Sequence, residues 1–480
     1  MSKEAVAFYF KETQPGEFLC ICGIKRKQKK HSGYSNLYNH ITGAHPQWRT
    51  EILQGQSTLT GVTQSGKNLF SWIKWITDCN LPFNFVDEHC TRAYTNLNPI
   101  CRQTLVNKVD KLVEKVEQNI SSKLPEKFGI IVDGWSVESE HYIAVFASYQ
   151  ENGVAKHPLL AFSPLIEEES LNAASHLQFI EFTLSVYKKS LNSLIFICCD
   201  NENTNKALAD LLKIPMIGCA SHRLNLAVKF YLQDAEIIVN KVCEVMKKLK
   251  TIKKAAELRC KTKLTAIVRN KTRWSSTYDM LCRYLQIKPF INREDNELKE
   301  LFLTANEEVV LDQMMSELKD LDSVTKKLQA ESTTMSDARS LFDAVIRKFP
   351  ALAKYLQFDS KIVHSKEFER AVVKAQRGEP LTDVDQQYIQ HFKNFVEVEE
   401  DEEPDVSFAD TVLSSSRKRA KSGYSCDWVP ATSNLCERSF SVAKNIKSPQ
   451  RNRLLPMHLE ALMFLKVNAC FWNENLVSKL

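Results

Sequence analysis

The sequence lacks any long apolar run. No stretch of its 480 residues approaches the roughly 20 consecutive apolar residues that a bilayer-spanning helix needs. Its first residues, MSKEAVAFYFKETQPGE, also lack the charged, then apolar, then small-residue order of a secretory signal. No internal repeat is visible. We therefore expect a protein of the cytosol or nucleus that makes no contact with a membrane.

A strong excess of charge of one sign is also missing, because the net charge is only +6. The distribution is more informative than the total: residues 1–50 carry eight Lys or Arg against three Asp or Glu. Such a patch suits a phosphate backbone, since Lys and Arg displace condensed counterions from DNA. A solvated charged loop would have the same composition. The candidate DNA-binding residues here are Lys25, Arg26, Lys27, Lys29 and Lys30.

Composition indicates a globular chain of two or three domains, with 44% apolar residues and a mean hydropathy of −0.29. Fourteen cysteines are irregularly spaced, and several lie inside apolar runs such as IFICCD. In a reducing compartment such residues are buried thiols or metal ligands rather than disulfide partners.

The first chemical motif is a pair of cysteines, Cys20 and Cys22, followed by His40 and His45. Two thiolates and two imidazoles form a tetrahedral Zn²⁺ ligand set. Residues i and i+2 of a strand point the same way, so both cysteines are expected to face one metal. The histidines lie just over one helical turn apart, and Pro46 is expected to end their helix.

The span FLCICGIKRKQKKHSGYSNLYNHITGAHPQW resembles a BED-type zinc finger. The usual pair in such fingers is Cys-x-x-Cys, whereas this chain has Cys-x-Cys, which tightens the turn. His31 is expected to be a loop residue. The alternative to zinc is two incidental thiols beside two surface histidines.

The pattern along the chain then changes several times. Ser57–Lys67 is a Ser/Thr/Gly-rich linker, and a helical pattern follows until Pro125. Three candidate strands come next, in FGIIVDGW, YIAVFASYQ and AKHPLLAFSPL. A helix, the apolar strand SLIFICCD, a helix over 203–212, a strand at Met216–Cys219 and a helix from His222 complete the series. Three meandering strands followed by strand–helix alternation is typical of a ribonuclease H-like α/β core.

The remainder is predicted to be helical on both sides of a charged segment. Residues 285–395 read as helices without a catalytic signature of their own. The acidic run EVEEDEEPD and the basic run SSSRKRAKS indicate a disordered, exposed linker. The basic cluster Arg417–Lys421 is either a nuclear import signal or an ordinary exposed basic run. The last 55 or so residues are again helical.

Two aspartates end apolar runs: Asp133 in IIVDGWS and Asp200 in FICCDNEN. An acid at the carboxyl end of a buried strand projects where open α/β sheets bind ligands. Two such acids can share hard cations such as Mg²⁺, and a metal pair can activate water and stabilise the leaving oxygen of a phosphodiester. The alternatives are a turn former for either acid, or a cap on the next helix for Asp200. A third acid, Glu437, lies beside Arg438 on a predicted helix, where such a pair would otherwise be a solvated face.

Four segments resemble the hAT-superfamily transposases, in that family's order. They are IIVDGWSVESEHYIAVFASY, CCDNENTNKALADLLKIPMIGCASHRLNLAVK, NKTRWSSTYDML and ATSNLCERSFSVAKNIKSPQRNRLLPMHLEALMFLKVN. The resemblance implies an acidic triad of Asp133, Asp200 and Glu437 holding Mg²⁺ or Mn²⁺. It also implies a helical insertion between the second Asp and the Glu, at residues 285–395. The C-terminal segment would double as a dimerisation surface, for which Arg451–Trp472 has an amphipathic pattern.

Two further pairs resemble family motifs. Cys219 and His222 form a Cys-x-x-His near the predicted site, where His222 would contact DNA or order the acids; a buried Cys and a capping His are the alternative. Arg273 and Trp274 resemble an Arg-Trp pair whose indole stacks on an extruded base. A core tryptophan is the alternative for Trp274, and packing is the expected role of Trp135.

These expectations combine into a multidomain protein: a small zinc finger, a helical segment, and a ribonuclease H-like α/β catalytic core interrupted by a helical insertion. The predicted function is a nuclear, Mg²⁺-dependent DNA transposase that binds double-stranded DNA and forms a homodimer or a larger homo-oligomer. The alternatives are a domesticated DNA-binding regulator without activity and a stand-alone nuclease. The predicted boundaries are 1–56 (finger), 57–68 (linker), 69–125 (helical DNA-binding or dimerisation region), 126–284 (core, first part), 285–395 (insertion), 396–424 (charged linker) and 425–480 (C-terminal core helix and dimerisation region).

Overall fold

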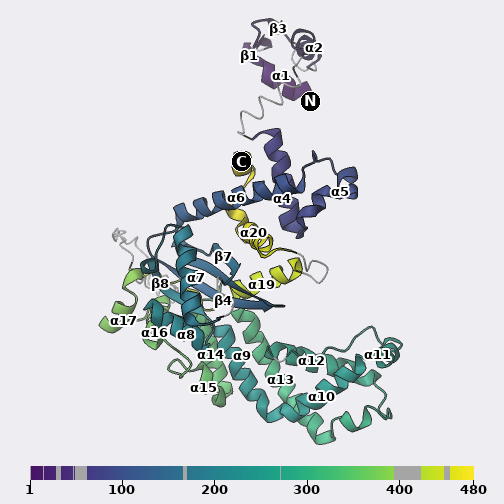
Figure 1. Cartoon of the computed structure of the whole chain (residues 1–480), viewed down its shortest axis with the longest axis vertical. Helices are drawn as coiled ribbons and strands as arrows, with labels where there is room; N and C mark the ends of the chain where they lie inside the picture. The colour runs from purple at the N-terminus through teal and green to yellow at the C-terminus, as the bar shows by residue number, and fades with distance from the viewer. Residues whose placement is uncertain are drawn as a thin grey trace, which may run out of the picture. The chain divides into compact units, whose positions relative to one another are not determined.

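The chain divides by internal contacts into two units, residues 1–119 with 468–480 and residues 120–467 (Figure 1). The computed structural model describes residues 2–14, 16–28, 34–46, 48, 62–165, 170–270, 272–393, 423–447 and 454–480. Within these residues, no helix has both the length and the apolar character that spanning a bilayer requires. The predicted nuclear import cluster and almost all of the predicted charged linker lie outside the described residues.

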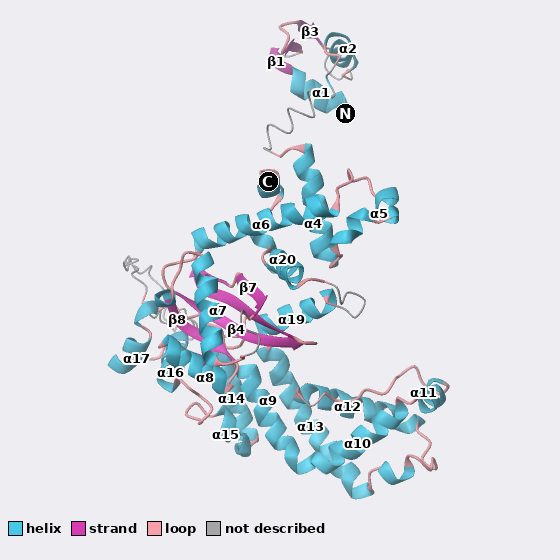
Figure 2. Cartoon of the chain, viewed as in Figure 1, coloured by secondary structure: helices cyan, strands magenta, loops and turns pink. Residues whose placement is uncertain are grey.

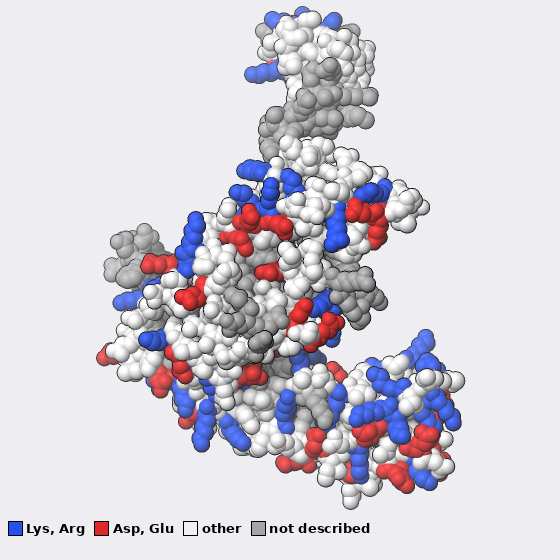
Figure 3. All heavy atoms as spheres, viewed as in Figure 1, with Lys and Arg blue, Asp and Glu red and all other residues white. Residues whose placement is uncertain are grey.

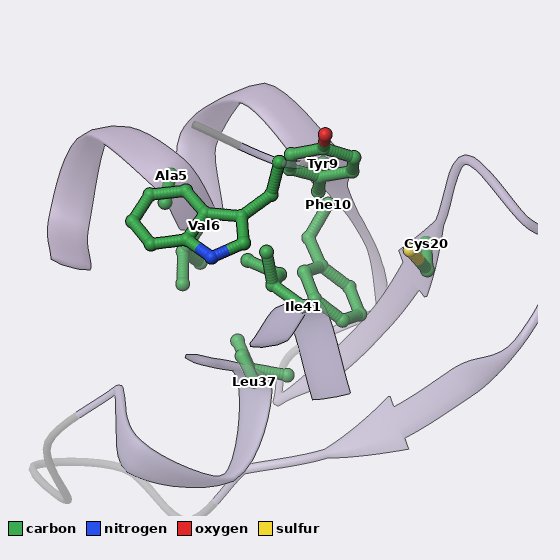
Figure 4. Packing of buried hydrophobic residues seen from close by; sticks show 8 residues of the cluster. Ala5, Val6, Tyr9, Phe10, Cys20, Leu37 and Ile41 are labelled. Atoms are coloured by element: carbon green, nitrogen blue, oxygen red, sulfur yellow. The ribbon is translucent and has the colours of Figure 1, made fainter. Parts of the chain in front are cut away.

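The first part of unit 1 is a three-stranded antiparallel sheet with two helices. Its elements are α1 (Ser2–Tyr9), β1 (Phe10–Gln14), β2 (Glu17–Cys20), β3 (Lys25–Lys27) and α2 (Ser35–Ala44). Figure 4 shows buried apolar side chains of this core packed together between the helices and the strands. The buried apolar residues are Ala5, Val6, Tyr9, Phe10, Cys20, Leu37, Ile41 and Trp48. A core this small rarely stabilises a fold alone, which is why domains of this size use a metal or disulfides.

The second part of unit 1 is helical. It comprises α4 (Gln64–Cys79), η1 (Phe83–Asp87), α5 (His89–Tyr94), most of α6 (Arg102–Lys123), η9 (Ala469–Phe471) and α21 (Glu474–Val477). Thr63 caps α4 by accepting from the Gly66 N–H at 3.0 Å, so the last residues of the predicted linker are already helical. The chain's C-terminal residues pack here, with the rings of Phe70 and Trp472 5.6 Å apart. Residues 468–480 thus group with the N-terminal unit rather than with the predicted C-terminal region.

Unit 2 is built on a mixed six-stranded sheet (Figure 2). Its strands are β4 (Phe128–Val137), β5 (Glu140–Glu151), β6 (Val154–Lys156), β7 (Leu159–Pro164), β8 (Leu194–Cys199) and β9 (Met216–Gly218). The order is β6-β5-β4-β8-β9, with β7 also paired to β5. β5 pairs antiparallel with both β4 and β7, whereas β8 and β9 continue the sheet parallel to β4.

The predicted strands are therefore present, with one difference. The segment AKHPLLAFSPL forms two strands, β6 and β7, because Pro158 between them has no N–H to donate to a ladder. All six residues of β8 are buried, as its unbroken apolar run predicted. The helix predicted over 203–212 is α8 (Asn203–Leu212).

The remaining helices of unit 2 cover the sheet and extend from it. α19 (Asn434–Ile446) packs on β4 and β5, and α20 (Pro456–Val467) packs on β7. α9 (Ala220–Tyr231), α10 (Glu236–Leu249), α12 (Trp274–Ile287) and α13 (Ala305–Leu328) pack together as a helical lobe with α11 (Ile252–Arg259) beside α10 (Figure 1). The others are α7 (Ala173–Val186), α14 (Met335–Lys348), α15 (Ala353–Leu356), α16 (Lys366–Arg377) and α17 (Asp383–Tyr388).

The amphipathic pattern predicted for Arg451–Trp472 is not what α20 shows. Five consecutive residues, Ala461 to Leu465, are buried, so the helix is covered on more than one face. Exposed apolar side chains are found instead at its start, where Leu455 is 53% and Met457 59% exposed. The expected pattern was that of a surface helix, which buries one narrow apolar stripe. α20 instead contacts both β7 and α19, so a wider part of its surface is buried.

Side chains from the predicted insertion protect the edge of the sheet. The N–H of Met216 donates to Ser365 Oγ at 2.9 Å, and the N–H of Gly218 donates to Glu369 Oε1 at 3.2 Å. Glu369 also pairs with Arg223, 3.3 Å away, whose side chain is buried. These contacts occupy the donors of β9, an edge strand that could otherwise pair with another chain.

Asp385 is the most strongly held acid of this helical region. Its fully buried carboxylate accepts from Lys374 Nζ at 2.8 Å and from Thr382 Oγ1 at 2.9 Å, and pairs with Arg370. Burial would raise its pKa, but the hydrogen bonds from Lys374 and Thr382 outweigh this and hold the pKa well below the usual range. Its stabilising charge is thus present above about pH 4, the unfolded pKa, and is lost as the pH falls further.

We expect Asp385→Ala to lower the free energy of unfolding by about 3 kcal/mol, because it removes a buried partner of two cations and a helix cap. Urea unfolding of the full chain at pH 7 measures the loss, which should shrink toward pH 3, because below about pH 4 the unfolded wild-type chain binds a proton at this carboxylate and the folded protein does not. Asp383→Asn, on the exposed side of the same helix turn, is the control. Equal unfolding of the two variants would contradict this role.

Candidate functional site

Four metal-ligating side chains meet in unit 1: Cys20, Cys22, His40 and His45. One ligand atom from each lies within 4.8 Å of all the others. Cys20 Sγ is 3.3 Å from His45 Nε2, and Cys22 Sγ is 3.3 Å from His40 Nε2. This close approach of two sulfurs and two nitrogens fits the compact tetrahedral set that Zn²⁺ takes. The group predicted from sequence is therefore assembled, and it could hold zinc.

The cysteines reach the site by a different route from the one predicted. β2 ends at Cys20, so Cys22 lies in the following turn and not two residues along a strand. Gly23 makes this turn possible with φ +85°, and its N–H donates to the Cys20 carbonyl at 2.8 Å. The tight turn, and not the alternation of side chains along a strand, brings both cysteines to the metal group. It also accommodates the short Cys-x-Cys spacing.

The histidines come from the end of α2, as predicted. His40 is buried in the last turns of the helix, and His45 is its C-cap residue directly before Pro46. Burial, with the nearby charges of Arg26 and His45, lowers the pKa of His40 and favours the neutral imidazole that binds metals. Burial and the neighbouring Cys22 raise the pKa of Cys20, so zinc binding must release a proton there.

Part of the basic patch is visible near this group. Lys25, Arg26 and Lys27 form β3 and are exposed, with Lys27 pairing with Glu17 at 2.9 Å. Lys29 and Lys30 lie outside the described residues, as does His31. The described half of the patch thus has the exposure that contact with a phosphate backbone requires.

In unit 2, the first two predicted acids lie at one edge of the sheet. β4 and β8 are parallel neighbours, with Ile131 opposite Cys198. Asp133 follows Ile131 by two residues and lies near the end of the buried part of β4. Asp200 follows Cys198 by two residues and comes directly after β8. Because parallel strands end on the same side, this register brings the two carboxylates together.

The third acid arrives on α19, some 230 residues later in the chain. The Sγ of Cys436 donates weakly to the Ile131 and Ala144 carbonyls, at 3.9 and 3.8 Å, so this helix start lies against β4 and β5. Trp135 stacks on Phe440 with the ring centroids 6.0 Å apart, which fixes the next turn of α19. Trp135 therefore packs rather than reacts, as predicted, and it helps to position Glu437.

Asp133 lies within electrostatic range of the other two acids. Burial, with the charges of Asp200 and Glu437, raises the pKa of Asp133 to about 8. Arg273 opposes this rise and pairs with Glu437 at 2.7 Å, while its side chain stays 60% exposed. Among the described residues only the Cys/His group has all its ligand atoms within 4.8 Å, so the carboxylates converge more loosely than that group does.

Asp200 has its own hydrogen-bond partners in the sequence NENTN. It accepts from the Asn205 side chain and from the Glu202 N–H, the latter at 3.2 Å. The N-cap residue of α8 is Glu202, so Asp200 is not the helix cap that was weighed as an alternative. Asn205 was missed by the sequence reasoning, although a polar Asn one turn into the helix after a strand-end acid could have indicated it.

The Cys-x-x-His pair also contacts this region. The N–H of Asn201 donates to His222 Nδ1 at 3.0 Å, which places the imidazole's own proton on Nε2. His222 thereby holds the loop that carries Asp200, and it does not cap α9, whose N-cap residue is Cys219. Cys219 is buried and accepts from the Ser433 N–H at 3.4 Å, close to the start of the helix that carries Glu437.

The base-stacking role predicted for Trp274 is not supported by its position. The residue is only 3% exposed, begins α12, and packs beside Tyr278 with the ring centroids 6.1 Å apart. The backbone N–H of Trp274 donates to Asn225 Oδ1 at 3.0 Å. A base could reach the indole only after α12 moved, so the geometry agrees with the alternative of a core tryptophan.

Two histidines near the acids were also missed. His176 on α7 has its pKa lowered by burial and by His141, while the charge of Asp200 raises it. His141 Nδ1 lies 2.8 Å from Ser136 Oγ. His176 stands within electrostatic reach of Asp200, and His141 within that of His176, but neither lies in a motif whose spacing indicates a site.

Two protein-family models match this chain. The ZBED1 RNase-like helical domain matches residues 217–317, and the hAT family C-terminal dimerisation region matches residues 428–469. The first covers β9 and α9 to most of α13, and so crosses the boundary predicted between residues 284 and 285; the second covers α19 and α20. A comparison with curated proteins finds no match. These two matched regions support a transposase-like protein of hAT type and support homo-oligomerisation through the C-terminal region.

Proposed function

We propose that this protein is a nuclear DNA transposase that cuts and joins phosphodiesters at a two-metal site formed by Asp133, Asp200 and Glu437. The single observation that carries the proposal is electrostatic: beyond the effect of burial, the charges of Asp200, at the end of β8, and of Glu437, on α19, raise the pKa of Asp133 on β4. The antiparallel order of β4, β5 and β7, followed by the parallel strands β8 and β9, supports a ribonuclease H-like core.

The donor set suits hard divalent cations. Carboxylate oxygens are the ligands that Mg²⁺ and Mn²⁺ prefer, and a cation would relieve the repulsion that raises the pKa of Asp133. When bound, the metals supply an activated water and stabilisation of the leaving oxygen. The protein's own residues position the site: Asn205 and His222 hold the loop of Asp200, and Arg273 fixes Glu437. Being exposed, Arg273 can also offer its guanidinium to a phosphate oxygen.

The N-terminal unit would bring this centre to DNA. We propose a BED-type finger in which Cys20, Cys22, His40 and His45 hold a structural Zn²⁺, with the exposed cations of β3 on the phosphate backbone. The hAT C-terminal region would join two or more copies, so that two DNA ends can be held in one complex. Apart from residues 64–68, which are helical, and residues 468–480, which group with the N-terminal unit, the predicted domain boundaries remain part of this proposal.

A second candidate is a DNA-binding regulator of the same origin that cuts nothing. Two observations favour it. The oxygen atoms of the three carboxylates do not all lie within 4.8 Å of one another, as the Cys/His ligand atoms do, and Trp274 is buried. Incubation of the purified full chain with Mg²⁺ and DNA carrying the inverted repeats that flank its gene separates the two. Nicks at the repeat ends, lost in EDTA, are expected of the transposase. DNA binding without nicking would overturn the catalytic proposal and leave the regulator.

A further inference from the structure

One short segment of the helical lobe carries more net charge than the entire chain. Residues 247–263 contain eight Lys or Arg and one acid, a net charge of +7, whereas the whole protein carries +6. The segment spans the end of α10, all of α11 and the first residues after it. Figure 3 shows Lys and Arg side chains gathered over this part of the lobe. The rest of the chain therefore has almost no net charge, and the excess is local.

Five of these cations are exposed and form no ion pair with any acid in the described parts of the chain. They are Lys248, Lys250, Lys253, Arg259 and Lys263, called the lobe patch below. Two neighbours behave differently: Lys254 is buried and paired with Asp295, and Arg269 pairs with Glu236 at 2.6 Å. Acids of the same lobe thus neutralise Lys254 and Arg269, whereas the lobe patch is exposed to solvent and forms no ion pair within the described residues.

The chain that leaves the lobe patch leads directly to the acidic centre. Residues 260–270, 272 and 273 form no helix or strand, yet side chains contact them at several points. Arg283 donates to the Thr265 carbonyl at 2.9 Å, and Asn225 donates to the Thr272 carbonyl at 3.3 Å. The segment ends at Arg273, whose guanidinium pairs with Glu437. The lobe patch and the three acids are therefore parts of one unit, joined by a fixed segment.

We propose that the lobe patch binds the phosphate backbone of the duplex DNA whose phosphodiester lies at the three acids. This inference rests on the proposed function and deepens it, because it names where the DNA is gripped beyond the finger. Flexible, exposed lysines without acidic partners suit a line of phosphates, whose counterions they displace.

A protein partner fits the same surface less well. Stable protein interfaces are anchored by buried aromatic, Arg and other apolar side chains at their centre. Between Met246 and Leu264 the lobe exposes one large apolar side chain, Ile252, which is 90% exposed and flanked by Lys250 and Lys253. An isolated aliphatic residue among lysines offers no such anchor.

The test compares two five-residue variants of the zinc-loaded full chain. The first replaces the lobe patch by alanine. The second is a matched control that replaces four lysines and one arginine elsewhere in the same unit, all exposed and without an acidic ion-pair partner among the described residues: Lys319, Lys327, Arg347, Lys361 and Lys393. Fluorescence anisotropy with a 40-base-pair duplex from 50 to 300 mM NaCl gives the affinity and its salt dependence, and circular dichroism with thermal melting confirms that both variants fold.

The lobe-patch variant should bind DNA at least tenfold more weakly than the wild type at 100 mM NaCl. Its slope of log K against log salt should fall by about 3 to 5, near one for each lost phosphate contact. The control should change neither value appreciably. Equal DNA binding by the two variants would overturn the DNA-binding role of the lobe patch while leaving the proposed function intact. A wild type that binds no duplex would overturn both. Loss of binding to a polyglutamate peptide with unchanged DNA binding would assign the surface to an acidic protein instead.

Discussion

Replacing Cys20 by serine should unfold residues 2–48 while residues 120–467 remain folded. The finger buries only a small cluster of apolar residues, and Cys20 belongs both to that cluster and to the metal group. Zinc binding to finger peptides supplies about 10–16 kcal/mol near pH 7, and this free energy is also the free energy of folding, because the unfolded chain has no preformed site. Losing one thiolate should remove most of it.

Two measurements on the full chain test this. Metal analysis of the purified protein should find about one zinc per chain in the wild type and far less in Cys20→Ser. Limited proteolysis should then cleave the variant within its first 50 residues while a stable fragment containing unit 2 persists. Cys79→Ser, at an exposed cysteine of α4 in the same unit, is the matched control and should retain zinc and protease resistance. Full zinc content in Cys20→Ser would show that the four side chains do not form the site.

Strand prediction succeeded in unit 2 because the residues there carry strong local signals. The apolar run before Asp200 is typical of a strand covered on both faces, and the structure buries every residue of β8. Turn residues also separated the strands, except that the third predicted strand is divided into β6 and β7 at Pro158. The α20 helix shows the limit of this reasoning, since its burial depends on β7 and α19, which lie far away in sequence. Periodicity describes one face of a helix, and distant elements can cover the others.

The candidate site was predictable only as far as its residues stand in recognisable motifs. The ends of two apolar strands indicated Asp133 and Asp200, and parallel register then brought them together. Nothing local joined them to Glu437: that convergence depends on Trp135 stacking on Phe440 and on Cys436 lying against β4 and β5. The burial of Trp274 was equally hidden, because a tryptophan at a helix start can face either solvent or core.

Asp133→Asn should abolish Mg²⁺-dependent cleavage and, at the same time, stabilise the metal-free protein. The first effect follows from the proposed chemistry: each factor of ten in rate corresponds to about 1.4 kcal/mol, and losing several kcal/mol of metal-assisted stabilisation lowers the rate by roughly 10³-fold or more. The second follows from the pKa of Asp133, which is raised to about 8 chiefly by burial and then by Asp200 and Glu437.

The sign of the stability effect is set by proton binding. Between the ordinary pKa of an aspartate, about 4, and the folded value of about 8, the native protein binds the proton more tightly than the unfolded chain does. Wild-type stability therefore falls as the pH rises through this window, by about 4 kcal/mol between pH 4 and pH 7 from this group alone. Asparagine carries no charge, so the variant should lose that part of the pH dependence and melt at a higher temperature in EDTA at pH 7 to 8.

Magnesium distinguishes this account from a generic stabilising substitution. A cation that binds the folded centre and not the unfolded chain should raise the melting temperature of the wild type by mass action, and should do so much less for Asp133→Asn. Asp312→Asn, an exposed aspartate of α13, is the control, and it should keep both cleavage and the magnesium response. Unchanged melting of the wild type in 10 mM MgCl₂, with no gain in Asp133→Asn, would mean that the folded protein neither disfavours the charge of Asp133 nor binds a metal through it.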